Sequence, residues 1–233
     1  MQILKTEQYI NEKLAIQLIT KDMLSDYKKP SVDETTSKFI EDNNLIWNPL
    51  SKSYDCGGDV KVSKDIVIDG KLKIRFGNVG GGFDCIKNGL TALEGAPNEV
   101  GGNFSCSFNN LATLEGAPKK VGGDFDCSSN NITTIEGAPQ EVGGDFDCSY
   151  NKLTTLEGTP KKVGGDFYCS YNNLTSLEGS PDIIDGEFVC EYNNLTSLDG
   201  APKRVGENFY CRDNPDLVLP KKKPSWVKGK IIS

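Results

Sequence analysis

The sequence predicts a β-rich solenoid, a stack of short turns with a parallel strand face and a small helical cap before it. A 21-residue unit of the form Phe-x-Cys-x-x-Asn-x-Leu occurs seven times over residues 83–216, with the last copy truncated. Phe and Cys alternate with a residue that faces outward, which is the period of a strand. A proline recurs in each return segment and bars a regular helix there. Such a fixed repeat indicates turns that bury their apolar side only against their neighbours.

One cysteine in each unit is predicted to point into the core. On parallel strands about 4.8 Å apart these thiols form a straight file, which cannot surround a metal ion tetrahedrally. Buried free cysteine packs as a small apolar residue. We therefore expect a packing role for the thiols, with no metal and no cofactor. The file includes Cys106, Cys127, Cys148, Cys169 and Cys190.

An asparagine follows each cysteine by three residues. A buried amide at every turn can bond the backbone of its own turn and of the next one, and thereby satisfies groups that a tight bend leaves unpaired. The sequence therefore predicts a row of buried asparagines, one per turn, that stabilises the stack. It includes Asn109, Asn130, Asn151, Asn172 and Asn193.

These repeats carry a resemblance to a known family. The segment Phe125-x-Cys127-x-x-Asn130-x-Ile132 resembles the strand core of leucine-rich repeats, in the short form found in bacterial effector proteins. The repeated Gly-Gly-Asp-Phe-Asp-Cys-Ser-Tyr-Asn wording is also similar to arrays encoded by large tailed bacteriophages and some bacteria. The resemblance covers residues 79–219 and implies a leucine-rich-repeat-like stack that binds proteins.

The segments outside the repeats are interpreted as caps, because both ends of a stack need covering. Residues 1–55 are predicted to be a helical cap or a docking module, with one helix over residues 5–26 and a second that starts at the capping box Ser31-x-x-Glu34. Residues 56–82 are predicted to be a degenerate first turn with a hairpin at Asp69-Gly70. Residues 217–233 are expected to form a C-terminal cap, with Trp226 on the last turn, and a solvated basic tail.

The composition excludes several classes of function. The chain has 33 acidic and 26 basic residues, no histidine and a net charge of −7, which argues against nucleic-acid binding. No apolar run is long enough for a membrane span and no signal peptide is evident, so we expect a cytoplasmic protein without membrane contact. If a bacteriophage encodes it, the host cytoplasm is the expected location. No pattern of an enzyme active site appears, and we expect no catalytic residues.

The outward positions of the strand face are the predicted binding surface. Tyrosine is favoured in interface hot spots, and carboxylates beside it favour a partner with basic patches. The predicted contact residues are Asp126, Asp147, Tyr168, Tyr210, Phe108, Tyr150, Tyr171, Tyr192, Asp145 and Asp166. An equally weighted interpretation is that the tyrosines only shield the strand edge and stiffen the stack.

The preferred function is non-catalytic binding of a partner protein, such as a host defence factor neutralised by a bacteriophage protein. Two alternatives stay open: a structural component of a virion or its assembly, and an effector whose activity resides in residues 1–55. The partner's identity and the oligomeric state are left open at this stage.

Overall fold

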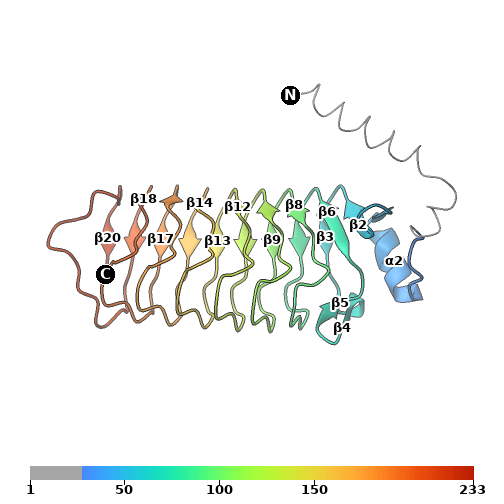
Figure 1. Ribbon diagram of the computed structural model, residues 1–233, viewed down its shortest axis with the longest axis horizontal. Coiled ribbons are helices and arrows are strands. Elements are labelled where there is room, and N and C mark those ends of the chain that lie inside the picture. Colours follow the sequence, from blue (N-terminus) through green and yellow to red (C-terminus); the bar gives the residue numbers. More distant parts are fainter. Residues whose placement is uncertain (1–27) are drawn as a thin grey trace, which may run out of the picture.

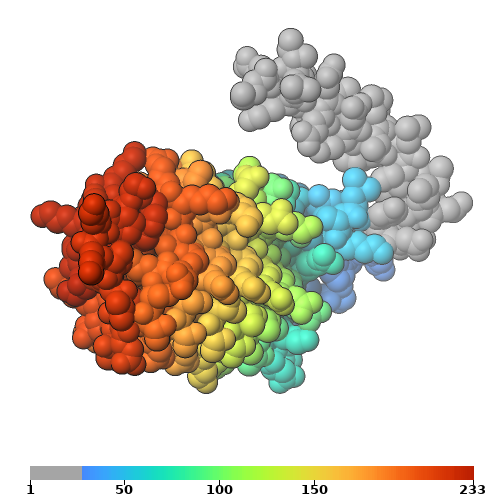
Figure 2. All heavy atoms as spheres, turned by 60° about the vertical axis from the view of Figure 1, so that its left-hand side comes forward, coloured from blue at the N-terminus to red at the C-terminus, as the bar shows by residue number. Residues whose placement is uncertain are grey.

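The computed structural model describes residues 28–233, and it is a β-solenoid whose turns stack along one long axis (Figure 1). The turns contribute short strands to two sheets of nine strands each, and the pairing is parallel except between residues 46–48 and 53–56 at one end, which pair antiparallel. Successive turns cross the surface as consecutive bands in the space-filling view (Figure 2). The predicted fold class is thus confirmed. The helix predicted over residues 5–26 lies outside the described residues.

Sheet B contains the Phe-x strands that the sequence predicted. Its parallel register places equivalent residues side by side, as in Phe125 with Phe146 and Asp126 with Asp147. Its strands are β3 (Val60–Lys61), β7 (Phe83–Asp84), β9 (Phe104–Ser105), β11 (Phe125–Asp126), β13 (Phe146–Asp147), β15 (Phe167–Tyr168), β17 (Phe188–Val189), β19 (Phe209–Tyr210) and β20 (Ile231–Ile232).

Sheet A was not expected from the sequence. It forms on the return side, where the regular 21-residue spacing of valine brings equivalent residues together, as in Val121 with Val142. Its strands are β1 (Ile46–Asn48), β2 (Ser53–Cys56), β6 (Phe76–Val79), β8 (Glu99–Val100), β10 (Lys120–Val121), β12 (Glu141–Val142), β14 (Lys162–Val163), β16 (Ile183–Ile184) and β18 (Arg204–Val205).

The core between the sheets is filled by phenylalanine, cysteine, leucine and valine side chains. Stacked phenylalanine rings run along it, with centroids 5.5 Å apart for Phe104 and Phe125 and 5.3 Å apart for Phe146 and Phe167. The cysteines are buried and free. Burial raises the pKa of the Cys127 thiol well above its usual value, so the thiol stays neutral and packs as an apolar group.

The Gly-Gly pair that precedes the Phe-x strands is required by the close packing of neighbouring turns. A Cβ atom on Gly164 would lie 2.1 Å from the carbonyl oxygen of Gly143 in the preceding turn. No side chain tolerates that distance. Glycine is therefore required at this point because the backbones of neighbouring turns approach closely, not because of a left-handed conformation.

Both ends of the phenylalanine stack are closed by edge-on rings. Helix α2 (Glu34–Asp42) places Phe39 against Phe76, with centroids 6.3 Å apart, at one end. At the other end, Trp226 meets Phe209 at 5.4 Å and an angle of 75°. These contacts protect the last apolar turns from water, as caps of a stack must.

Three details of the caps differ from or refine the sequence prediction. The N-cap of α2 is Asp33, whose side chain accepts a hydrogen bond from Thr36 N at 2.7 Å, so the prediction of Ser31 as N-cap was wrong. The hairpin is present, with β4 (Val67–Ile68) pairing antiparallel to β5 (Lys71–Leu72) after the short 3₁₀ helix η2 (Lys64–Ile66). The lysines of the C-terminal tail are exposed, as expected of a solvated tail, but its last residues are also tied to the stack, because β20 pairs with β19.

Candidate functional site

The outer side of sheet B presents three parallel rows of side chains, which together we call the sheet-B face. The first row precedes each phenylalanine and holds the carboxylate file Asp124, Asp145, Asp166 and Glu187. The central row lies between phenylalanine and cysteine and includes Asp126, Asp147, Tyr168 and Tyr210. The third row precedes each buried asparagine and includes Phe108 and the tyrosine row, Tyr150, Tyr171 and Tyr192.

The asparagine file holds the third row in place. Asn151 Nδ2 donates to the carbonyls of Cys148 in its own turn and Cys127 in the preceding turn, each at 3.1 Å. Its Oδ1 accepts from Ile132 N at 3.0 Å. The amide thus links its turn to the preceding turn rather than to the following one. The same arrangement recurs along the file, which keeps successive turns in register.

The carboxylate file has a structural task that the sequence did not indicate. One oxygen of each aspartate accepts a backbone N–H from the next turn. Asp145 Oδ1 accepts from Asp166 N at 2.8 Å, and Asp166 Oδ1 accepts from Glu187 N at 2.7 Å. The second oxygen of Asp166 accepts from Tyr168 Oη at 2.7 Å. Asp145 and Asp166, predicted as partner contacts, therefore offer a partner only part of their hydrogen-bonding capacity.

The central row contains two half-buried aspartates that cap their own turns. Asp126 Oδ1 accepts from Ser128 N at 2.9 Å, and Asp147 Oδ1 accepts from Ser149 N at 2.8 Å. Burial raises the pKa of the Asp147 carboxyl, and this effect exceeds the opposite one of the Ser149 hydrogen bonds. The Asp147 carboxylate is therefore poorly solvated by water, and a cation from outside would stabilise it.

The tyrosine row exposes three stacked aromatic rings on the sheet-B face. The rings of Tyr150 and Tyr171 are 4.3 Å apart at an angle of 9°, and those of Tyr171 and Tyr192 are 4.2 Å apart at 11°. Each ring lies directly on its neighbour because the turns repeat in register. These three side chains are 53%, 39% and 45% exposed, respectively, so their edges and hydroxyl groups face solvent.

The backbone beneath this row is left-handed, where glycine is normally preferred. Tyr150, Tyr171 and Tyr192 have φ of 56°, 56° and 54°. Such a conformation costs an L residue about 1–2 kcal/mol. Ring stacking contributes about 0.5–1.5 kcal/mol per pair and offsets that cost. Lys87, Ser129 and Asp213 share this conformation without a stacked ring, so hydrogen bonds between turns also hold it, and ring stacking adds stability where tyrosines occur.

The predicted contact residues do not form one cluster. The three tyrosines of the row lie together, whereas Phe108 belongs to the same row but is separated from Tyr150 by Ser129. Lys87 precedes Phe108, with its Nζ 4.9 Å from the ring centroid. The interruption at Ser129 is already present in the order of residues that precede the asparagines. The left-handed backbone was not predicted from the sequence.

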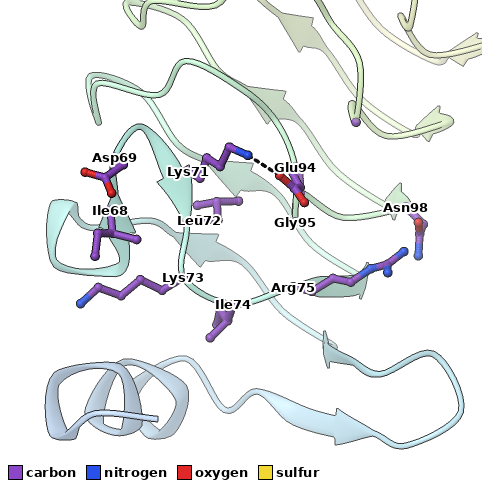
Figure 3. Close-up of a pocket in the computed structure, with 12 residues that line it drawn as sticks. Ile68, Asp69, Lys71, Leu72, Lys73, Ile74, Arg75, Glu94, Gly95 and Asn98 are labelled. Carbon is purple, nitrogen blue, oxygen red and sulfur yellow. Dashed lines mark hydrogen bonds and ion pairs between the residues drawn. The ribbon is translucent and has the colours of Figure 1, made fainter. Parts of the chain in front are cut away.

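A hollow lies on another part of the surface, beside the β4–β5 hairpin (Figure 3). It encloses about 780 Å³ and is lined by Lys71, Lys73 and Arg75, among other residues. Lys71 Nζ lies 2.8 Å from Glu94, and Lys73 Nζ lies 3.2 Å from Asp33. Lys71 and Lys73 are already paired with carboxylates, so the hollow has fewer charged groups free to bind a ligand than the sheet-B face has.

Comparisons of the chain with protein-family models, with curated proteins and with solved structures gave no significant match. In residues 28–233 no helix is long and apolar enough to cross a membrane. The same residues contain no cluster of three or more acidic, thiol or imidazole side chains arranged to hold a metal ion.

Proposed function

We propose that this protein is a non-catalytic interaction module that binds a partner protein through the sheet-B face. The observation that carries the proposal is the tyrosine row, three stacked and half-exposed rings on a left-handed backbone. Nothing in the packing of the turns requires aromatic side chains there, since Ser129 and Asp213 adopt the same backbone conformation in the same row.

The chemistry of the face favours a basic protein surface as the partner. Tyrosine buries a large, rigid apolar area at small entropic cost and keeps a polar tip, which suits it to interface hot spots. The half-buried carboxylates of Asp126 and Asp147 lie in the next row and form no ion pair among the described residues. Basic groups of a partner would balance the negative charges of these two carboxylates.

The sequence resemblances narrow the biological setting of the proposal. The leucine-rich-repeat-like pattern favours a protein-binding stack, and the bacteriophage-like wording favours a host defence factor in the cytoplasm as the target. A structural role in a virion and an effector activity in residues 1–55 are the competing functions. They make different predictions: recovery of the chain within purified particles, and turnover that survives deletion of the repeats.

Affinity capture followed by reconstitution from purified components tests the proposal. The test variant changes Tyr150, Tyr171 and Tyr192 to alanine. The matched control changes three exposed residues of sheet A, Glu99, Lys120 and Glu141, to alanine. A stoichiometric partner retained by the wild-type protein and the control but lost by the tyrosine variant, at equal helix and strand content, supports the proposal. Retention of the partner by the tyrosine variant refutes it.

A further inference from the structure

Ser129 leaves a gap between two aromatic residues of the third row, Phe108 and Tyr150. The backbone continues through it without change, since Phe108, Ser129 and Tyr150 have φ of 56°, 55° and 56°. The hydrogen bonds between turns also continue, with Phe108 N donating to Ser128 O at 3.1 Å and Ser129 N donating to Ser149 O at 3.0 Å. A short hydroxymethyl group therefore stands where a ring would fit.

The width of this gap suits one planar group. Parallel strands are about 4.8 Å apart, so two turns separate Phe108 from Tyr150 by about 9.6 Å. Neighbouring rings of the row stack at 4.2–4.3 Å, and two such steps fit that separation. The exposed fractions are consistent with an open gap. Tyr171 has a ring on each side and is 39% exposed, whereas Tyr150 and Phe108 border the gap and are 53% and 54% exposed.

The charge around the gap is negative. Asp126 precedes Ser129 by three residues, and Asp147 holds the equivalent position in the next turn, where the two are register partners in sheet B. Asp147 Oδ1 accepts from Ser149 N, and Asp126 accepts from Ser128 N and Oγ through Oδ1 and from Ser105 Oγ at 3.0 Å through Oδ2. Neither carboxylate forms an ion pair among residues 28–233. The only cation of this row near Phe108 is Lys87, one turn further from the gap.

We propose that this gap is a slot for one arginine guanidinium of the partner protein, stacked between the rings of Phe108 and Tyr150 and compensated by Asp126 and Asp147. Guanidinium is planar, weakly hydrated and cationic, so it satisfies the shape and the charge of the slot together. A lysine ammonium has the charge without the plane. The inference rests on the proposed function of the sheet-B face and identifies a specific contact within it.

Three blocked tripeptides probe the slot directly: acetyl-Gly-X-Gly-amide with X as arginine, citrulline or lysine. Citrulline keeps the plane and lacks the charge. Binding is measured by NMR from the ring signals of Phe108 and Tyr150. The test variant is Ser129→Tyr, which completes the row on a backbone that already carries tyrosine at equivalent positions. The control is Ser129→Gly, which suits the left-handed backbone and leaves the slot open.

The arginine peptide is expected to bind the wild-type protein and Ser129→Gly with similar affinity, and about tenfold more weakly to Ser129→Tyr. Asp147→Asn should also weaken it, and the citrulline and lysine peptides should bind less well. No binding of the arginine peptide, or equal binding of the lysine peptide, overturns the slot. Equal binding of citrulline overturns the assignment of arginine.

The same variants separate this inference from the proposed function. If Ser129→Tyr keeps the protein partner while the triple tyrosine variant loses it, the sheet-B face binds as proposed and the arginine slot is wrong. If the arginine peptide binds in the slot but the triple tyrosine variant keeps the protein partner, the proposed function fails on its own.

Discussion

Replacing Asn151 with leucine tests the link between the asparagine file and the stability of the stack. Asn151 is 8% exposed and makes four hydrogen bonds to backbone groups. Two of its acceptors keep another partner in the variant, because Cys127 O also accepts from Asn130 and Cys148 O also accepts from Asn172, each at 3.1 Å. The amide of Ile132, which donates to Asn151 Oδ1 at 3.0 Å, has no such substitute.

The main cost of Asn151→Leu is therefore one buried N–H without an acceptor. An unsatisfied buried donor costs about 1–3 kcal/mol. For a chain of this length, a loss of about 2 kcal/mol lowers Tm by about 4–8 °C. The local consequence is specific as well, since hydrogen exchange at the Ile132 amide should accelerate more than exchange at amides in distant turns.

Urea unfolding followed by circular dichroism measures the free energy, and hydrogen exchange measures the local effect. The matched control is Lys152→Leu, which adds the same side chain at the exposed neighbouring position and should change stability by less than about 0.5 kcal/mol. If Asn151→Leu unfolds at the same urea concentration as Lys152→Leu, and Ile132 exchanges as slowly as before, the structural role of the asparagine file is refuted.

Two further substitutions test the sheet-B face. Tyr171→Ala loses ring contacts on both sides while keeping the left-handed strain, so it should destabilise the fold by about 1–2 kcal/mol, whereas Tyr171→Gly also relieves the strain and should cost less. Equal unfolding free energies for these two variants would contradict the argument. The pKa of Asp147 is raised in the folded protein, so its carboxyl contributes stability that is complete below its ordinary value of 3.8 and is lost as pH rises through the folded-state pKa. The Asp147→Asn variant has no carboxyl to ionise, so its unfolding free energy should rise relative to that of the wild type between about pH 3 and pH 7. If the two unfolding free energies, measured with urea, change with pH in the same way, the burial of Asp147 has no such effect.

The repeat itself made much of the fold predictable. A 21-residue period with phenylalanine and cysteine two residues apart permits only a stack in which equivalent residues face the same way. The inward files and the parallel strands of sheet B follow from that pattern, and the packing of Trp226 on the last turn was also predicted, whereas its edge-on geometry was not. The N-cap of α2 was misplaced because Ser31 and Asp33 are both good capping residues, and only the tertiary path of the chain selects Asp33.

The candidate site depended more on the tertiary structure. The sequence indicated which aromatic and acidic residues face outward, because that requires only the alternation of a strand. It did not indicate that Asp145 and Asp166 bind backbone amides of the following turns, since those bonds join residues 21 positions apart. It also did not reveal the left-handed backbone beneath Tyr150, which depends on hydrogen bonds to the adjacent turn.

The sequence by itself determined the period, the composition of each inward file and the order of residues along each outward row. Only the tertiary structure decided the second sheet, the contact between successive tyrosine rings and the space that Ser129 leaves between two neighbouring rings. The physical reason is the distance over which each property acts. Alternation and turn chemistry are local to a few residues, whereas a row, a ladder or a slot exists only once separate turns lie about one strand spacing apart.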